Sequence, residues 1–229
     1  MTAISIPIIL FKQFEVTSGG HILLEACDHD WMPGIWYEII GPASSGKTTL
    51  LNTIAGFHDS WTGQLNVLGC DMAPKNHDRR RSVRRKMGFA TQIVSVLMDK
   101  TMRLNVSMAL QSVDIESKSD IDKRVSQILE HFYLSEKKLI PAKHLSWTEL
   151  AFLQLIQATV HNPQLLLIDH VLQYLDLPDR EIWIGFLKEY YIKQNACIIS
   201  TGNHPLLSPG AAVCQLHLNN KKLEPLKLV

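Results

Sequence analysis

One short stretch restricts what this chain can fold into more than any other. It is Gly41-Pro42-Ala43-Ser44-Ser45-Gly46-Lys47-Thr48, and it follows an apolar run. The spacing G-x-x-x-x-G-K-T is typical of a phosphate-binding loop, in which glycines let backbone amides turn inward around phosphate oxygens and the lysine reaches the β and γ groups. Residues 37–40 are predicted to end a strand, and residues 47–55 to form a helix whose positive end faces the anion.

The motif therefore predicts a nucleotide site. We expect the nucleotide to be bound by Gly41, Pro42, Ala43, Ser44, Ser45, Gly46, Lys47, Thr48 and Thr49. The Thr48 hydroxyl is expected to hold Mg²⁺. The alternative is a glycine-rich turn that binds nothing.

The bulk composition sets outer limits on the fold and on the partners. A chain of 229 residues can bury one good-sized core, or one core with a small lobe attached. The longest apolar runs, residues 4–11 and 165–168, are too short to cross a bilayer, and a net charge of +1 gives no general field for nucleic acid. No secretion signal is indicated, and the four cysteines lack paired spacing, so we expect a cytosolic protein with reduced thiols.

The first third of the chain is predicted to be rich in strands. Residues 4–16 and 21–31 form two of them around a Ser-Gly-Gly turn, residues 35–40 lead into the phosphate loop, and residues 61–69 alternate like a further strand. Residues 78–86 are dense in arginine, which raises the question of nucleic acid or acidic lipid. Because no aromatic residues are interleaved, a solvated helix face is favoured.

The rest of the chain is predicted to alternate between helices and strands. A short strand at residues 87–90 precedes two helices within residues 101–133, which a polar stretch separates. Ser146 and Glu149 fit a capping box that starts a helix to about residue 160. Residues 165–169 form an apolar run that ends in Asp169, typical of a buried strand whose end reaches a site. A helix at residues 178–194, a strand at 196–201 and a closing hairpin from residue 213 follow.

These motifs, in this order, resemble the nucleotide-binding subunits of ABC transporters over nearly the whole chain. Gln92 falls at the Q-loop glutamine, Leu145-Ser146 begins the signature, residues 165–169 match the Walker B strand, and Leu175-Asp176 matches the D-loop. Residues 97–110 are similar to the subgroup that serves lipoprotein release, macrolide export and cell division. The order of the motifs carries the resemblance, because each later motif is weak alone.

The resemblance implies a fold and a way of working. The fold is α/β, a P-loop NTPase of ABC type: a mixed, largely parallel sheet around the phosphate-loop helix, an antiparallel β lobe near the N-terminus, and a helical lobe at about residues 93–160 inserted into one domain of residues 1–229. Two subunits would sandwich two ATP molecules, each site joining one chain's phosphate loop to the other's signature. Mg²⁺ would be held by Thr48, Gln92 and Asp169, and Gln92 would also sense the γ-phosphate. The dimer seam would involve Ser146, Trp147, Glu149 and Asp176.

The residues for hydrolysis depart from the family's pattern, so that no intact catalytic set is expected. The family places a glutamate after the Walker B aspartate as general base, and here that position is His170. The simplest interpretation is a histidine that fills space and hydrogen-bonds locally. The family's switch histidine is replaced by Gly202-Asn203, and His204 sits two residues late, so only a bulge could bring an imidazole to the γ-phosphate.

The signature and the base-stacking position are altered as well. Trp147 and Thr148 replace two signature glycines, and a Cβ obstructs the close approach of backbone amides to a partner's phosphate. Trp147 could instead serve as an aromatic anchor on an interface. The aromatic residue that stacks on adenine is replaced by Ser18, and Phe14 would need a different register to take its place.

The sequence thus predicts an ATP-binding subunit of an ABC transporter-type membrane complex, with weak or absent hydrolysis. Its expected partners are an integral membrane permease subunit and a second ATP-binding subunit, either the same chain or a different one, with no nucleic acid. Its expected place is the inner face of the cytoplasmic membrane. Two alternatives stay open: an active ATPase motor that uses His170 and His204, and an interaction module that binds no nucleotide.

Overall fold

Two sheets and a group of helices make up the computed structural model, which describes residues 6–91, 95–113, 117–208, 210 and 212–226. Within these residues the smaller sheet has four antiparallel strands in the order β2-β1-β4-β5. They are β1 (Ile9–Ser18), β2 (His21–Trp31), β4 (Trp61–Val67) and β5 (Cys70–Asp71). This is the antiparallel β lobe that the sequence predicts near the N-terminus.

The larger sheet has six strands among the described residues, in the order β10-β9-β3-β8-β7-β6. All neighbours are parallel except the β9–β10 hairpin. The strands are β3 (Trp36–Ile40), β6 (Met87–Ala90), β7 (Leu165–Asp169), β8 (Cys197–Gly202), β9 (Val213–Asn219) and β10 (Lys222–Pro225). The predicted mixed, largely parallel sheet is confirmed.

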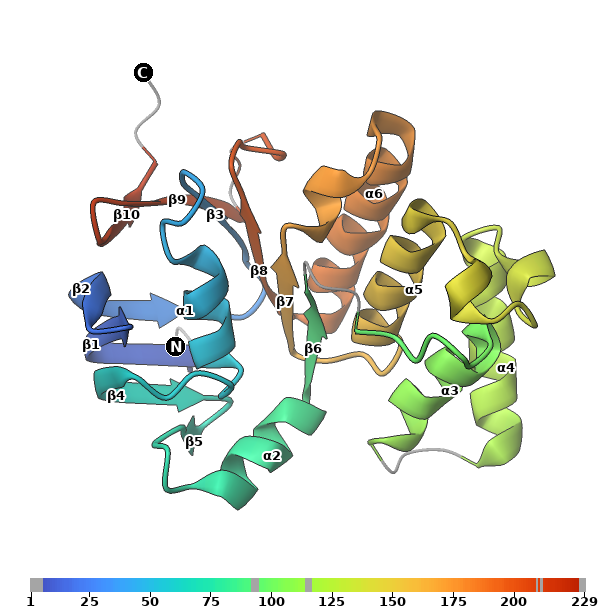
Figure 1. Ribbon diagram of the computed structural model, residues 1–229, viewed down its shortest axis with the longest axis horizontal. Helices are drawn as coiled ribbons and strands as arrows, with labels where there is room; N and C mark the ends of the chain where they lie inside the picture. The colour runs from blue at the N-terminus through green and yellow to red at the C-terminus, as the bar shows by residue number, and fades with distance from the viewer. Residues whose placement is uncertain (1–5, 92–94, 114–116, 209, 211, 227–229) are drawn as a thin grey trace, which may run out of the picture.

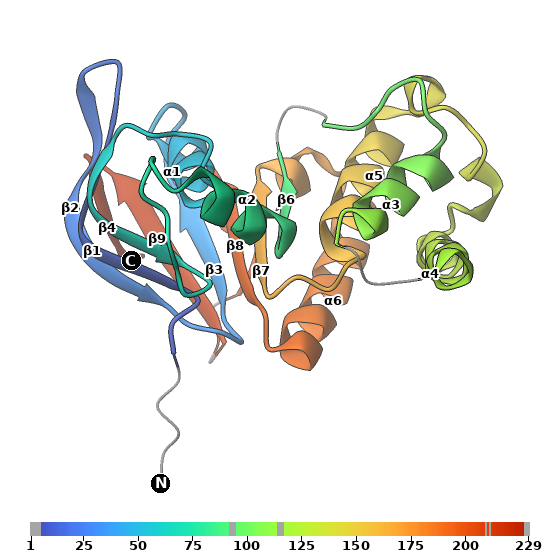
Figure 2. The same ribbon diagram turned by 90° about the horizontal axis from the view of Figure 1, so that it is seen from below.

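The helices lie on both faces of the larger sheet (Figures 1 and 2). They are α1 (Lys47–Ile54), α2 (His77–Arg85), α3 (Met102–Gln111), α4 (Lys118–His131), α5 (Trp147–Thr159) and α6 (Leu177–Gln194). Among the described residues, the 3₁₀ turns η1 (Ser135–Lys137) and η2 (Ala142–His144) lie between α4 and α5, and η3 (Val171–Tyr174) lies between β7 and α6. Helix α1 lies between the two sheets, whereas α3, α4 and α5 gather at the far side of β6 (Figure 1). The inserted helical lobe and the single domain stay predictions.

Alternation along the central strands divides the core into two clusters. Leu165 and Leu167 of β7 pack with α1 and the antiparallel sheet, whereas Leu166 and Ile168 pack with α5, α6 and their neighbours. Because helices or a second sheet cover both faces, every residue of β7 is buried. This explains why the strand is a continuous apolar run, and it leaves only the carboxyl end of the strand open to a site.

Two local predictions differ from the structure. Arg80 does not lie on a solvated face of α2; its side chain is buried, donates to the Gly56 carbonyl and forms an ion pair with Asp59 at 2.6 Å. Arginine permits this because its guanidinium offers several donors on a long apolar stem. Strand β1 begins at Ile9, and a bulge with Gln13 at a φ of 47° interrupts it.

The bulge decides where Phe14 points. It places Phe11 and Phe14 on the same buried side, with their rings stacked at 4.2 Å between centroids. Phe14 is 0% exposed, so it cannot offer a face to a nucleotide base. None of the described helices is both long and apolar enough to cross a membrane.

Candidate functional site

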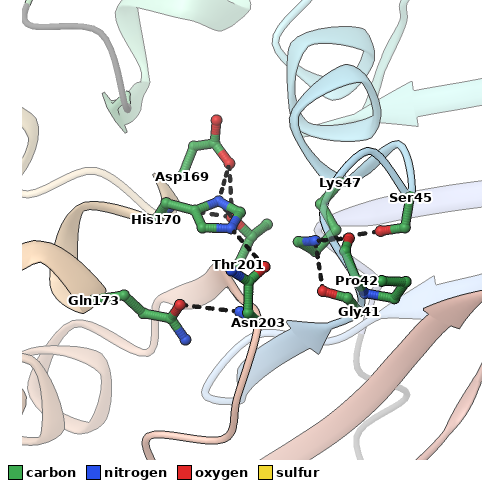
Figure 3. A network of polar contacts seen from close by, with 9 residues as sticks. All are labelled: Gly41, Pro42, Ser45, Lys47, Asp169, His170, Gln173, Thr201 and Asn203. Atoms are coloured by element: carbon green, nitrogen blue, oxygen red, sulfur yellow. Dashed lines mark hydrogen bonds and ion pairs between the residues drawn. The ribbon is translucent and has the colours of Figure 1, made fainter.

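The phosphate loop follows β3 directly and is closed by its own lysine. Lys47 Nζ donates to the carbonyl oxygens of Gly41 and Pro42, each at 2.8 Å, and to Ser45 Oγ at 3.2 Å (Figure 3). The lysine is only 3% exposed, and burial lowers its pKa, an effect that the nearby Asp169 charge partly offsets. Its three donors are thus satisfied by the loop that it closes.

Backbone geometry explains two of the loop's glycines. A Cβ on Gly41 would lie 2.3 Å from the Leu218 carbonyl oxygen, so no other residue fits between β3 and β9. Gly46 adopts a φ of 98°, in the left-handed region that favours glycine. Ser44 also adopts a left-handed conformation, with a φ of 62°, where the family's pattern has glycine.

The first turn of α1 adds backbone donors to the loop. Gly46 occupies the N-cap position, and no side chain caps the helix there. No acidic residue lies in the first turn. The first N–H groups of a helix lack partners within the helix and carry its positive dipole end, so they attract anions. Together with Lys47 they form a cradle for phosphate oxygens.

Asp169, at the end of β7, faces this loop across the sheet edge (Figure 3). Thr201 of the neighbouring strand β8 donates its hydroxyl to Asp169 Oδ1 at 2.7 Å. The carboxylate is 2% exposed. Burial raises the pKa of Asp169, but hydrogen bonds with His170, Thr201 and Thr48 outweigh that effect and hold the pKa below its usual value. The carboxylate is therefore ionised at neutral pH, and the Thr48 hydroxyl lies next to it.

This pair of oxygens suits one kind of metal ion. The described residues contain no group of three or more His, Cys, Asp or Glu side chains placed to hold a metal. A metal here would therefore depend on Thr48, Asp169, water and the oxygens of a bound phosphate. Mg²⁺ takes few protein ligands and keeps substrate phosphates and waters as the rest of its shell. The donor set fits Mg²⁺ bound with a nucleotide.

His170 is tied to its neighbours through both ring nitrogens. Nδ1 lies 3.2 Å from Asp169 Oδ1 and 3.1 Å from Thr201 Oγ1, and Nε2 lies 3.4 Å from Asn203 Oδ1. Its backbone N–H donates to Thr201 Oγ1 at 3.2 Å, and its φ is 60°. The residue at the family's general-base position thus hydrogen-bonds locally, as the simplest sequence interpretation expects.

The end of β8 carries no bulge that would move His204 toward the loop. The parallel register runs without a shift from Trp36↔Ile198 to Ile40↔Gly202. His204 is exposed, and its carbonyl oxygen accepts from Gln173 Nε2 at 2.8 Å. Asn203 donates its backbone N–H to Gln173 Oε1 at 3.0 Å. The loop after β8 is therefore bonded to the turn after β7.

The two interface segments of the sequence prediction begin helices. Ser146 caps α5 in the predicted capping box: Ser146 Oγ accepts the Glu149 N–H at 3.3 Å, and Glu149 Oε2 accepts the Ser146 N–H at 2.8 Å. Asp176 caps α6 by accepting the Asp179 N–H at 3.2 Å. Trp147 is 80% exposed at the first position of α5. With Tyr174 it lines a cavity of about 360 Å³ between α5 and η3.

The structure therefore sorts the predicted site residues into groups. The phosphate loop, Thr48, Asp169 and His170 meet at one sheet edge, whereas Trp147 and Asp176 begin helices beside the η3 turn. Gln92 lies outside the described residues. Sequence reasoning missed Thr201 and Gln173. Thr201 could have been found, since parallel strands end at the same edge; nothing in the sequence pattern points to Gln173.

The fold is that of a P-loop NTPase of ABC type: a mixed, largely parallel sheet with a phosphate loop at the carboxyl ends of its strands, an antiparallel lobe and a group of helices. A family model described as ABC transporter matches residues 24–173, more than half of the chain. The chain belongs to the ABC transporter family.

Relatives and solved structures agree with this assignment. The methionine import ATP-binding protein MetN of Clostridioides difficile (strain 630) is 31% identical over 163 residues, 71% of this chain and 50% of the relative. MetN of Bifidobacterium longum (strain NCC 2705) is 30% identical over 177 residues, 74% of this chain and 44% of the relative. The chain thus spans about half the length of the curated relatives it matches. The similarity to the export and cell-division subgroup stays a prediction.

Solved structures share the fold at lower identity. The dimeric post-hydrolysis state of the ATP-binding cassette MJ0796 bound to ADP and Pi has a TM-score of 0.83 at 21% identity, covering 94% of this chain and 96% of that one. cbiO1 from Clostridium perfringens, part of the ABC transporter complex cbiONQ, has a TM-score of 0.79 at 18% identity, covering 95% and 86%.

Proposed function

We propose that this chain is the ATP-binding subunit of an ABC transporter-type membrane complex, and that it binds Mg-ATP with weak or absent hydrolysis. One observation carries the proposal. The residues that would hold phosphate and metal are assembled at the carboxyl ends of the central strands. They include the buried Lys47, the first turn of α1, which no side chain caps, and the ionised Asp169 next to Thr48. The residue at the base position is instead committed to local hydrogen bonds.

Binding would use groups that the loop already presents. Lys47 would exchange bonds with the Gly41 and Pro42 carbonyls for bonds with the β and γ phosphates, and the α1 N–H groups would donate to the same oxygens. Thr48 and Asp169 would hold Mg²⁺, which neutralises phosphate charge when bound. Gln92 would complete the metal's shell. These steps need no movement of the sheet, because the pairing of β3, β8 and β7 already holds the phosphate loop and Asp169 near each other.

Hydrolysis would need a base beside the attacking water and a group that contacts the γ-phosphate. His170 has its nitrogens facing Asp169, Thr201 and Asn203, not an open position. Gly202, at the end of the strand that precedes the switch, has no side chain to offer. Both features favour binding without turnover.

A subunit that binds but does not turn over nucleotide would act through differential affinity. ATP would favour one arrangement of the complex by binding it more tightly than the other. The partners would be a membrane permease subunit and a second ATP-binding subunit, at the inner face of the cytoplasmic membrane. The names of the relatives support this, since one solved neighbour is part of a transporter complex and another is dimeric. Trp147 and Asp176 would lie at the seam between the two ATP-binding subunits.

Calorimetry with Mg-ATP on the purified chain tests the proposal, followed by phosphate release on the same samples. The matched variants are Lys47→Ala and Lys123→Ala, since Lys123 is exposed on α4. We expect binding in the parent chain and in Lys123→Ala, loss of binding in Lys47→Ala, and phosphate release at background in all three.

The other outcomes favour the two alternatives. Phosphate release that depends on Lys47 would favour an active motor with unusual residues. Absence of binding in the parent chain would favour an interaction module, which the burial of Phe14 and the lack of an aromatic side chain at Ser18 also support.

A further inference from the structure

The side chain of Gln173 lies across the end of β8 and binds the loop beyond it at two points. Its Oε1 accepts the Asn203 N–H at 3.0 Å, and its Nε2 donates to the His204 carbonyl oxygen at 2.8 Å. Gln173 belongs to η3, the turn that follows β7 and precedes α6 (Figure 3). One carboxamide thus joins two loops that are about thirty residues apart in the chain.

The same side chain occupies the space next to Gly202. A Cβ on Gly202 would lie 2.1 Å from Gln173 Nε2 and 2.7 Å from its Cδ, and the three nearest heavy atoms all belong to Gln173. Gly202 does not adopt a positive φ, so its backbone conformation is open to other residues. A side chain at position 202 is therefore excluded by Gln173 and not by the backbone.

The turn that carries Gln173 is itself held from behind. Arg180 of α6 donates to the Leu172 carbonyl at 3.0 Å, to the Gln173 carbonyl at 3.3 Å and to the Leu175 carbonyl at 2.6 Å. These bonds fix the backbone of η3 against α6. The Gln173 carboxamide therefore extends from an anchored turn, which limits the freedom of the loop that it binds.

A chain of hydrogen bonds connects Gln173 to Asp169, the carboxylate that would bind metal in the proposed site. Asn203, held through its N–H by Gln173, places its Oδ1 3.4 Å from His170 Nε2. His170 in turn places Nδ1 3.2 Å from Asp169 Oδ1. Gln173 touches neither Asp169 nor the phosphate loop in these contacts, but it fixes the residue that orients the imidazole beside Asp169.

We propose that Gln173 is a positioning residue that fills the side-chain space of position 202 and fixes residues 202–204 to the η3 turn. The loop after β8 then forms a fixed wall of the site and does not move when nucleotide binds. This last consequence rests on the proposed nucleotide binding. The attachment of residues 202–204 to η3 does not depend on nucleotide binding, because the hydrogen bonds that make it are present without nucleotide.

A double-mutant cycle between Gln173 and Gly202 tests the fixing. In the parent chain, Gly202→Ala displaces the carboxamide and breaks both of its hydrogen bonds, so we expect the melting temperature to fall by about 4 °C. In the Gln173→Ala background the space is empty, and Gly202→Ala leaves the melting temperature unchanged or raises it, since alanine reduces the entropy of the unfolded chain.

Two control variants make the cycle specific. Gly88→Ala would place a Cβ 1.9 Å from the Ala158 carbonyl oxygen, a backbone clash that Gln173→Ala cannot relieve. Gln127→Ala removes an exposed glutamine of α4 and leaves the cost of Gly202→Ala unchanged. Equal costs of Gly202→Ala in the parent and Gln173→Ala backgrounds would overturn the proposal.

Hydrogen exchange of the Asn203 backbone N–H provides the second measurement. We expect this exchange to accelerate about tenfold in Gln173→Ala, and equally in Gln173→Met, because methionine keeps much of the side-chain volume but has no carboxamide. Unchanged exchange in both variants would contradict the attachment of this loop to η3.

Addition of Mg-ATP tests the fixed wall. Protection of the Asn203 backbone N–H in the parent chain should stay within about twofold when Mg-ATP is added. A rise of more than tenfold would overturn the fixed wall. If no ATP binds, the proposed function fails while the cycle still decides the role of Gln173.

Discussion

The phosphate loop and the strand ends opposite it are held together by different kinds of group. The loop is shaped by backbone: left-handed residues, the first turn of α1 and a lysine bonded to main-chain carbonyls. The opposite edge is held by side chains, with Asp169, His170, Thr201 and Gln173 bonded to one another or to the loop after β8. Backbone geometry depends on few residue identities, whereas the opposite edge depends on the identity of each side chain.

This comparison separates binding from turnover in physical terms. A cradle made of N–H groups and one cation recognises phosphate without any further chemistry. ATP hydrolysis needs a base with free access to water, whereas both ring nitrogens of His170 contact neighbouring side chains. Four variants, three at the edge held by side chains and one at the start of α5, should affect different measurements and so sharpen or break the comparison.

The largest effect is expected at Asp169, the carboxylate opposite the phosphate loop. Asp169→Asn removes the charge that would orient Mg²⁺, so we expect ATP affinity in the presence of Mg²⁺ to fall by about 10- to 100-fold. Affinity measured with chelator should hardly change. Calorimetry with and without Mg²⁺ checks this, with the exposed Asp30→Asn as the control. Equal losses with and without metal would mean that Asp169 acts on the loop and not through Mg²⁺.

The next effect concerns stability. Thr201→Val removes the hydroxyl that donates to Asp169 and accepts from the His170 N–H, so we expect it to lower the free energy of unfolding by about 1.5 kcal/mol at pH 7. Thr201→Ser retains the hydroxyl and should cost less. Urea denaturation of both variants and the parent gives the difference.

The stability difference between the parent chain and Thr201→Val depends on pH through the ionisation of Asp169. Its pKa in the folded state lies below the ordinary value of 3.8, so the stabilisation is present above that value and is lost as the pH falls through the folded-state pKa. The gap between the parent chain and Thr201→Val should therefore narrow below about pH 4. A gap that widens on acidification would show that the hydroxyl does not stabilise the ionised carboxylate.

A smaller effect is expected at the base position. His170→Ala removes contacts of 3.1 to 3.4 Å, and we expect a loss of about 1 kcal/mol or less in the free energy of unfolding. Phosphate release should stay at background, as in the parent chain. Turnover in the parent that disappears in His170→Ala would assign His170 to catalysis. The histidine control is His161→Ala, in the turn that follows α5.

The smallest effect on the isolated chain is expected at Trp147. Its side chain is 80% exposed, so Trp147→Ala should change the free energy of unfolding by less than about 0.5 kcal/mol and leave ATP affinity unchanged. Thermal unfolding and calorimetry check both. A large loss of stability would show that the residue packs within its own chain and is not an interface anchor.

Sequence patterns predicted much of the fold and the positions of several candidate-site residues. The phosphate loop, the strand that ends in Asp169 and the capping box of Ser146 and Glu149 were each predicted at their observed positions. All three leave a signal within a few consecutive residues: the spacing of a loop, an apolar run that ends in a carboxylate, and a capping box. The irregularity within β1 was not predicted, since the bulge at Gln13 leaves no pattern in the alternation of residues.

Only the tertiary structure decided which distant side chains meet. Thr201 reaches Asp169 because β7 and β8 are parallel neighbours, and Gln173 lies over Gly202 on a turn that Arg180 anchors. Arg80 is buried because its guanidinium bonds to the segment that follows α1. These contacts join segments far apart in the chain, and no local pattern specifies them. The sequence determined where phosphate would bind, because a loop and a helix start create that site locally; packing between strands decided what surrounds it.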